Sequence, residues 1–285
     1  MKKKIIAIVS AILVLAMFAS CAAPKAAEAT QAPEVTEAPV AEATAAPEAP
    51  AGPILMQDGV LTVGMEVGYP PFEDFAEDGT TPVGYDVDFA TALGEKLGLS
   101  VVFINTAWDG IFQGIGVNYD CVISAVTITP ERQETMLFSD PYINNYQAVV
   151  VRADYDGTIA SFQDLDGFAI AVQKETTSDI LMSDYVATGS ITCTISANEK
   201  VTTCFTQLQN GEVDAVVVDS TVATGYIAAN PDLYKLAFQD ESEPEQFGVA
   251  MGLDNTALQA AINEAIAQLT SEGFFEDSIA YWFGK

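Results

Sequence analysis

Arg132 is one of two arginines in the chain, and its neighbours make it a candidate ligand for an anion. It closes residues 124–132, which read Ser-Ala-Val-Thr-Ile-Thr-Pro-Glu-Arg and follow a short apolar segment at 121–123. A guanidinium presents a planar fork of N–H donors that fits a carboxylate at two points, and Thr127 adds a hydroxyl and a backbone N–H nearby. The alternative is a surface arginine in a helix-starting turn, because the preceding Pro-Glu pair suits a helix N-terminus.

Strand-like and helix-like segments alternate along residues 58–240, which indicates an α/β protein with mainly parallel sheets covered by helices. We expect strands at 60–65, 101–104, 121–124, 148–151, 168–172, 191–195 and 215–218, and helices at 88–97, 110–116, 178–185, 199–209 and 220–229. The C-terminal part departs from this order, with a strand at 248–251 and a helix at 255–269 for which Asn255 is a suitable cap.

Three polar or backbone candidates follow the ends of expected strands. They are Glu66, Ala125 and Asp219. Ligands of open α/β sheets bind beyond the carboxyl ends of the strands. The order of elements along the chain therefore agrees with a binding site formed by these positions.

Residues 1–20 have the three parts of an export signal: Lys2, Lys3 and Lys4, an apolar core at 5–18, and then small residues. The apolar core is shorter than the roughly 20 residues that a permanent membrane span needs. Cys21 follows Phe-Ala-Ser, which resembles a bacterial lipoprotein cleavage box. We expect acylation of Cys21 and anchoring to the outer face of the membrane; the alternative is an ordinary signal peptide cut nearby.

Residues 21–57 are expected to form a disordered tether. Ala, Pro, Glu and Thr dominate this segment, which lacks aromatic residues and cannot bury enough apolar surface to offset the entropy of ordering. About 228 residues remain after it, which is enough for two modest domains.

Composition excludes several classes of function. The net charge of −29 argues against nucleic acid, whose phosphates would be repelled. The chain has no histidine, which removes the commonest metal ligand and every histidine-activated nucleophile, and we expect no metal or cofactor. Cys193 and Cys204 are candidates for a disulfide in an exported protein, whereas Cys121 is expected to be a small buried hydrophobe.

Six further motifs, together with residues 124–132, resemble those of the extracellular solute-binding proteins that supply polar amino acids to ATP-driven importers. They read VGMEVGYPPF at 63–72, VGYDVDF at 83–89, AWDG at 107–110, FSDPY at 138–142, NGEVDAVVVD at 210–219 and YWFG at 281–284. No single motif is specific, but their order and spacing are those of the family, and the resemblance covers nearly all of residues 58–285.

The resemblance implies a two-lobed type II periplasmic-binding-protein fold in which the chain crosses twice between α/β lobes. The crossings are expected near residues 144–146 and 243–245. Lobe 1 would comprise residues 58–144 and 246–285, and lobe 2 residues 145–245. Two crossings form a hinge that can close about a solute.

The resemblance also implies that the solute is a free amino acid, whose two charges need an anion grip and a cation grip. Arg132 and Thr127 would hold the carboxylate, completed from lobe 2 by Thr176 and Thr177, whose alternative role is N-capping of a helix. Asp219 would bind the ammonium group, with N-capping of the helix at 220–229 as its alternative.

A second ammonium contact would come from the Ala125 carbonyl, at a position where the family usually has Gly or Ser.

The solute's side chain would lie between Tyr69 and Trp108, whereas Phe72 is expected in the core. Glu66 suggests specificity, because the family often has an acidic residue there when the solute has a basic or amide side chain. An inward Glu66 would repel an acidic solute, so we expect Lys, Arg, ornithine or Gln. The alternative is a solvated glutamate at the end of a strand.

Residues 173–177 depart from the family pattern at Glu175, where Gly or Ala is usual. This glutamate either faces solvent or reaches the cleft, and Gln173 is a further residue that could face the solute.

The expected function is capture of a free amino acid by a monomeric binding protein and delivery to the permease and ATPase subunits of an ABC importer. One alternative is an enzyme of the cyclohexadienyl dehydratase type on the same fold, with Glu175 as proton donor and Lys174 as the nearby cation. Another is a lipoprotein used for sensing or adhesion, whose tether would look identical.

Overall fold

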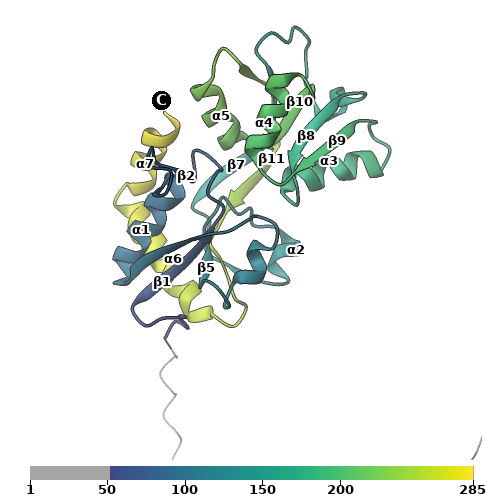
Figure 1. Cartoon of the computed structure of the whole chain (residues 1–285). Helices are drawn as coiled ribbons and strands as arrows, with labels where there is room; N and C mark the ends of the chain where they lie inside the picture. Colours follow the sequence, from purple (N-terminus) through teal and green to yellow (C-terminus); the bar gives the residue numbers. More distant parts are fainter. Residues whose placement is uncertain (1–51, 285) are drawn as a thin grey trace, which may run out of the picture. The chain divides into compact units, whose positions relative to one another are not determined.

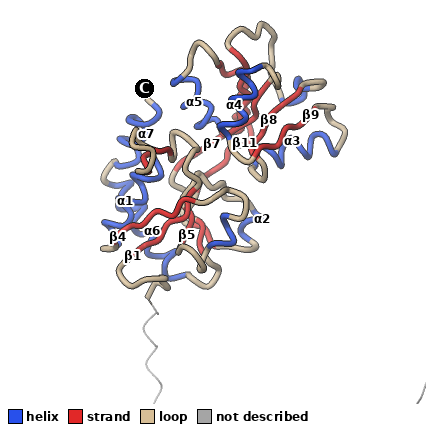
Figure 2. Tube along the Cα trace, in the orientation of Figure 1, coloured by secondary structure: helices blue, strands red, loops and turns tan. Residues whose placement is uncertain are grey.

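The computed structural model describes residues 52–284, which contain two five-stranded sheets (Figures 1 and 2). The proposed signal peptide, Cys21 and the tether up to residue 51 lie outside the described residues. Within the described part, no helix is long and apolar enough to cross a membrane.

The first sheet is built from both ends of the described chain. Its strands, in spatial order, are β4 (Ser100–Asn105), β1 (Val60–Met65), β5 (Cys121–Val122), β12 (Ala250–Met251) and β6 (Leu137–Phe138). The helices associated with it are α1 (Tyr85–Leu97), α2 (Pro130–Gln133), α6 (Thr256–Ser271) and α7 (Phe274–Phe283), with the 3-10 turn η1 (Ile111–Gly114) and the ribbon β2 (Asp74–Phe75) and β3 (Pro82–Val83). β1 pairs in parallel with both β4 and β5, as the strand–helix alternation predicts.

The second sheet uses the middle of the chain. Its strands, in spatial order, are β11 (Tyr234–Phe247), β7 (Ile143–Arg152), β10 (Ala215–Asp219), β8 (Ala169–Gln173) and β9 (Thr194–Asn198). The helices α3 (Thr177–Ala187), α4 (Val201–Asn210) and α5 (Ser220–Ala229) pack against it, and the 3-10 turn η2 (Phe162–Leu165) precedes β8. The valines of β10 are buried on both faces, which is typical of a central strand in a covered sheet.

Two long strands, β7 and β11, connect the sheets (Figure 1). They are antiparallel and pair with each other where the crossings were expected, with Asn145 opposite Glu245 and Asn144 opposite Gln246. The register is irregular between Asp240 and Glu245. The connections are thus hydrogen-bonded strands rather than loops, and the lobe limits within them stay a prediction.

Most expected elements are present, but several limits were wrong. The strand expected at 191–195 is β9, which begins at Thr194. Ile191 instead packs in the core, and the Thr192 amide and hydroxyl both donate to Asp166, so these residues are held as a loop before pairing with β8 begins. The strand expected at 121–124 is only two residues long, because the backbone turns at Ala125.

Asn255 does not cap α6 in the expected way. It occupies the N-cap position, but its side chain makes no capping bond. It bonds instead with Ile54, whose amide donates to Oδ1 at 3.0 Å and whose carbonyl accepts from Nδ2 at 2.7 Å. The residue therefore ties the start of the described chain to the start of α6.

The core expectations for Phe72 and Cys121 are confirmed. Phe72 is fully buried, with ring centroids 5.8 Å from Tyr85 and 5.4 Å from Phe247. Cys121 is buried in β5, and Cys193 and Cys204 are free, so the disulfide considered for that pair is absent from the structure.

Candidate functional site

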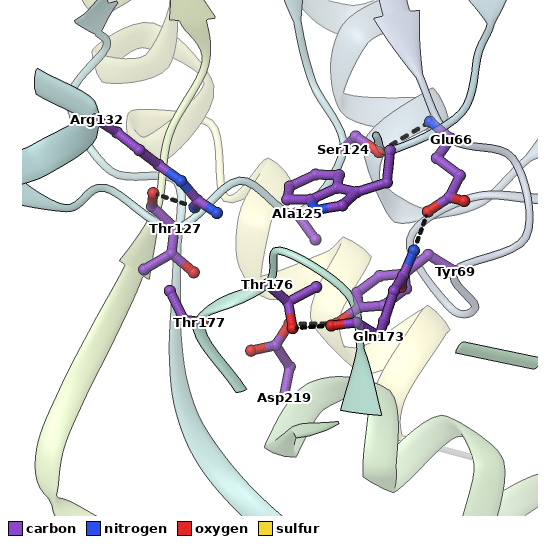
Figure 3. A pocket seen from close by; sticks show the side chains of 11 residues that line it. Glu66, Tyr69, Ser124, Ala125, Thr127, Arg132, Gln173, Thr176, Thr177 and Asp219 are labelled. Atoms are coloured by element: carbon purple, nitrogen blue, oxygen red, sulfur yellow. Dashed lines mark hydrogen bonds between the residues drawn. The ribbon is translucent and has the colours of Figure 1, made fainter. Parts of the chain in front are cut away.

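All nine residues that the sequence pointed to line one cavity (Figure 3). Ser124 and Gln173 complete the lining. The remaining members are Glu66, Tyr69, Trp108, Ala125, Thr127, Arg132, Thr176, Thr177 and Asp219. Several lie at strand ends, where general topology expects a ligand. Glu66 follows β1, Gln173 and Asp219 end β8 and β10, and Ser124 lies two residues after β5.

Arg132 is not a solvated surface arginine. It lines the cavity from the short helix α2, and its Nη1 donates to the Thr127 carbonyl at 2.8 Å. Its guanidinium carbon lies 5.5 Å from the centre of the Trp108 ring and 5.2 Å from that of Phe112. Among residues 52–284 it forms no ion pair. Most of its N–H donors therefore remain for an incoming anion.

Asp219 provides the opposite charge from the end of β10. Its Oδ2 accepts from the Tyr69 hydroxyl at 2.5 Å, and its Oδ1 accepts from Asn145 Nδ2 at 2.6 Å and Gln147 Nε2 at 3.0 Å. Burial first, and the nearby charge of Glu245 second, raise the pKa of Asp219 to about 7. The carboxylate makes no capping bond to α5, so the N-cap alternative is wrong.

Glu66 is only 5% exposed, so the solvated alternative is wrong. Its Oε2 accepts from Gln173 Nε2 at 2.6 Å, and the same amide donates to the Glu199 carbonyl at 3.1 Å. Both partners are acceptors, which fixes the orientation of the amide. Glu66 Oε1 and Gln173 Oε1 consequently remain buried without a partner. Burial raises the pKa of Glu66.

The hydroxyls of Thr176 and Thr177 have different partners. Thr176 accepts from the Asp179 amide at 3.3 Å and donates to the Gln173 carbonyl at 2.7 Å, so N-capping of α3 is real there. Thr177 accepts from Gln147 Nε2 at 3.1 Å and donates to Glu245 Oε2 at 3.3 Å.

Ala125 and Ser124 are held by buried carboxyl groups behind the cavity. Ala125 has φ 48°, a left-handed conformation, and its amide donates to Asp86 Oδ2 at 2.7 Å. Ser124 Oγ accepts from the Glu66 amide at 3.0 Å and donates to Glu73 Oε1 at 2.6 Å. This chain of bonds fixes the backbone that borders the cavity.

Sequence reasoning assigned Ser124 no role in the site and indicated Gln173 only as a residue that could face the solute. For Gln173 a signal existed, because it is the polar residue that ends the apolar strand β8, as Asp219 ends β10. Ser124 directly follows the apolar residues 121–123 in the same way. The rule that polar residues at parallel strand ends face a ligand would have found both.

The sequence matches the family model for bacterial extracellular solute-binding proteins, family 3, over residues 61–285. The chain belongs to this family. Among curated relatives, ABC transporter arginine-binding protein 1 of Escherichia coli K12 is 31% identical over 78% of this chain and 90% of the relative. The L-cystine-binding protein TcyJ of the same organism is 32% identical over 79% and 83%.

Solved structures of arginine-binding proteins resemble this solute-binding protein along most of its length. An ancestral arginine-binding protein bound to arginine is 34% identical, with a TM-score of 0.73, over 79% of this chain and 98% of that one. The same kind of ancestral protein bound to glutamine is 35% identical, also with a TM-score of 0.73, over 80% and 100%. The two-lobed type II fold expected from the sequence is thereby confirmed.

The dehydratase alternative is not supported for this solute-binding protein. Glu175, its proposed proton donor, does not line the cavity; its side chain is exposed and lies 3.7 Å from Lys174. Its backbone has φ 61°, a left-handed conformation that glycine adopts without strain. An ancestral amino acid-binding protein described as a precursor of cyclohexadienyl dehydratase is 32% identical over 79% of this chain, with a TM-score of 0.72, and is itself a binding protein by its name.

The buried carboxyls of Glu73 and Asp86 should make the stability of the binding protein depend on pH. Burial raises the pKa of both carboxyls, that of Asp86 to about 7, and Asp86 raises that of Glu73 further. Unfolded carboxyls titrate near pH 4, so between about pH 4 and 7 the folded state binds more protons. We expect the free energy of unfolding to fall by about 4 kcal/mol as the pH rises through this window, from Asp86 alone.

Urea denaturation at a series of pH values measures this dependence. Asp86→Asn keeps an acceptor for the Ala125 amide and should flatten the pH profile. A wild-type profile that rises from pH 5 to 7, or one that Asp86→Asn leaves unchanged, would contradict the prediction.

Proposed function

We propose that this protein captures a free L-amino acid with a basic or amide side chain and delivers it to the permease and ATPase of an ABC importer. The observation that carries the proposal is that one cavity is lined by a guanidinium from α2, which forms no ion pair within residues 52–284, and by a buried carboxylate at the end of β10. Two further buried acceptors of the same cavity lack a hydrogen-bond partner. The proposal assigns capture and release to the protein rather than bond-making. A solute that contacts both lobes would stabilise the closed state.

The two ends of an amino acid suit the two sides of the cavity. Arg132 and Thr127 are the proposed ligands of the carboxylate, together with the start of α3 at Thr176 and Thr177. Asp219 is the proposed ligand of the ammonium group. The Ala125 carbonyl is proposed as its second acceptor.

The side-chain preference rests on hydrogen-bond satisfaction and charge. Glu66 Oε1 and Gln173 Oε1 are buried acceptors without donors, and a buried unsatisfied acceptor costs about 1–3 kcal/mol. A guanidinium, ammonium or amide group on the solute would satisfy them. A carboxylate would meet Glu66 and be repelled. Lys, Arg, ornithine and Gln are therefore favoured over Glu and Asp, with Tyr69 and Trp108 flanking the aliphatic stem.

The protein is further proposed to be exported as a lipoprotein, anchored through Cys21 and held by the tether at 21–57. It is proposed to act as a monomer whose lobes, 58–144 with 246–285 and 145–245, close about the hinge strands. The export-signal pattern and the extracellular family support this arrangement. Mass spectrometry of the mature N-terminus tests it, since an unacylated terminus other than Cys21 would exclude the anchor.

A thermal-shift screen of the chain from residue 22 onward, against the common amino acids and ornithine, tests the solute. A ligand at about 100 times its Kd adds roughly 2.7 kcal/mol of stability, which is several degrees for a protein of this size. We expect such shifts with L-arginine, L-lysine, L-ornithine or L-glutamine. Shifts with none of the amino acids, or the largest with L-glutamate, would sink the proposal.

Glu66→Gln tests the preference for a basic solute side chain without changing the proposed ligands of the carboxylate and ammonium groups. The variant keeps an acceptor for Gln173 but removes the charge, so L-arginine should lose about tenfold in affinity and L-glutamine much less. Glu175→Gln, which removes an exposed charge outside the cavity lining, is the matched control.

A further inference from the structure

Glu245, on the hinge strand β11, is a half-buried carboxylate that no sequence motif drew attention to. Its Oε2 accepts from the hydroxyls of Thr127 at 3.2 Å and Thr177 at 3.3 Å. Gln147 Nε2 donates to both of its oxygens at 3.1 Å, and Asn145 Nδ2 donates to Oε2 at 3.2 Å. A carboxylate of the protein itself is thus bound by two side chains of β7, one at the start of α3 and one in the segment between β5 and α2.

Two of these donors belong to the proposed carboxylate grip. A threonine hydroxyl has one hydrogen, so it donates to one acceptor at a time. While Glu245 accepts from Thr127 and Thr177, neither hydroxyl has a hydrogen for a solute carboxylate in the cavity. Arg132 is left as the remaining side-chain donor of the grip, since it forms no ion pair within residues 52–284.

We propose that Glu245 is a resident carboxylate that occupies the Thr127 and Thr177 hydroxyls and must give them up when a solute carboxylate binds. The inference rests on the proposed function, because it assigns these hydroxyls to the carboxylate end of an amino acid. Glu245 then acts as an internal competitor for these hydroxyls and lowers the affinity for the solute.

The negative charges at this end of the cavity indicate that Glu245 competes with a solute carboxylate rather than helping it to bind. Asp219 and Glu245 share the amides of Asn145 and Gln147, so two acidic groups already lie close together. A solute carboxylate held at Arg132 would add a third negative charge beside them. Like charges a few ångströms apart disfavour each other even at a partly exposed site.

The backbone around Glu245 is fixed, so displacement must occur through its side chain. The Ile128 amide donates to the Gln246 carbonyl at 2.8 Å, and the Gly248 amide donates to the Val126 carbonyl at 3.0 Å. These bonds hold the backbone of Glu245 next to Thr127. The half-exposed side chain has water on one side, into which its carboxylate can turn.

The test removes one charge from the protein and one from the ligand, separately and together, and compares the four affinities. Titration calorimetry on the chain from residue 22 onward measures them. L-Arginine and L-argininamide differ in the carboxylate alone when both α-amines are protonated. Glu245→Gln removes the charge, keeps one acceptor oxygen and replaces the other with an NH2 donor. We expect L-arginine to bind about tenfold tighter to the variant, whereas L-argininamide, whose ammonium group would also lie near Glu245, should bind no tighter. Glu243→Gln, an equal charge change at an exposed position of β11, should alter neither affinity.

Two outcomes would overturn the inference. Weaker L-arginine binding to Glu245→Gln would make Glu245 a ligand of the solute rather than its competitor. An equal change for both ligands would show that Glu245 does not sense the solute carboxylate. Absence of L-arginine binding to wild type and both variants, with no amino acid active in the thermal-shift screen, would instead mark failure of the proposed function itself. A folded variant is verified by its unfolding temperature, and Glu245→Ala provides a second charge-free variant if Glu245→Gln is unstable.

Discussion

Arg132→Ala is expected to weaken amino-acid binding by at least about 100-fold, because truncating one partner of a desolvated charge pair costs on the order of 2–5 kcal/mol. The side chain lines the cavity, and its guanidinium forms no ion pair within residues 52–284, so its charge is available to the solute. Titration calorimetry with the best amino acid of the thermal-shift screen measures the loss. Near-normal affinity would remove Arg132 from the site.

The chain supplies a matched control for this substitution. Arg152 is its only other arginine; it donates to the Val213 carbonyl at 3.2 Å and does not line the cavity. Arg152→Ala should leave the affinity unchanged. Arg132→Lys, which keeps the charge but loses the planar fork, should give an intermediate affinity. A loss of affinity equal in both alanine variants would point to general destabilisation instead of a lost ligand.

Asp219→Asn is expected to cause a comparable loss, again about 100-fold or more, by removing the counter-charge of the solute ammonium group. The substitution preserves the size of the side chain among Tyr69, Asn145 and Gln147. Asp232→Asn removes an exposed acid from the same half of the chain and should have no effect. Calorimetry at neutral pH compares the two variants, and equal affinities would contradict the assignment of Asp219.

The raised pKa of Asp219 adds a pH signature to this prediction. Burial and the charge of Glu245 raise the pKa of this carboxyl to about 7, and a bound ammonium group favours its ionised form. Below pH 7 the carboxyl must therefore release a proton on binding, and affinity should fall by up to about tenfold per pH unit; above pH 7 it should level off. Asp219→Asn should lose this dependence. Calorimetry in buffers of different ionisation enthalpy detects the proton directly, and a flat wild-type profile would refute the mechanism.

Local sequence patterns predicted the elements that carry the site. The apolar run of β10 and the helix α5 after it were expected at residues 215–218 and 220–229, which the structure matches within one residue. Both predictions rest on the burial pattern within one short segment. They therefore do not require knowledge of the segments that pack against it. β9 was misplaced because hydrophobicity at Ile191 reflects a buried loop, and the register with β8 depends on hydrogen bonds that periodicity does not encode.

The sequence by itself determined which charged residues are available to the site, above all Arg132, Asp219 and Glu66, and their charges limit the solute. Only the tertiary structure decided what surrounds them. Glu245 lies 118 positions from Thr127 and 68 from Thr177, yet its carboxylate bonds to both hydroxyls. The physical reason is that hydrogen bonds between distant segments depend on how those segments pack in three dimensions. The periodicity of a local sequence segment does not encode that packing.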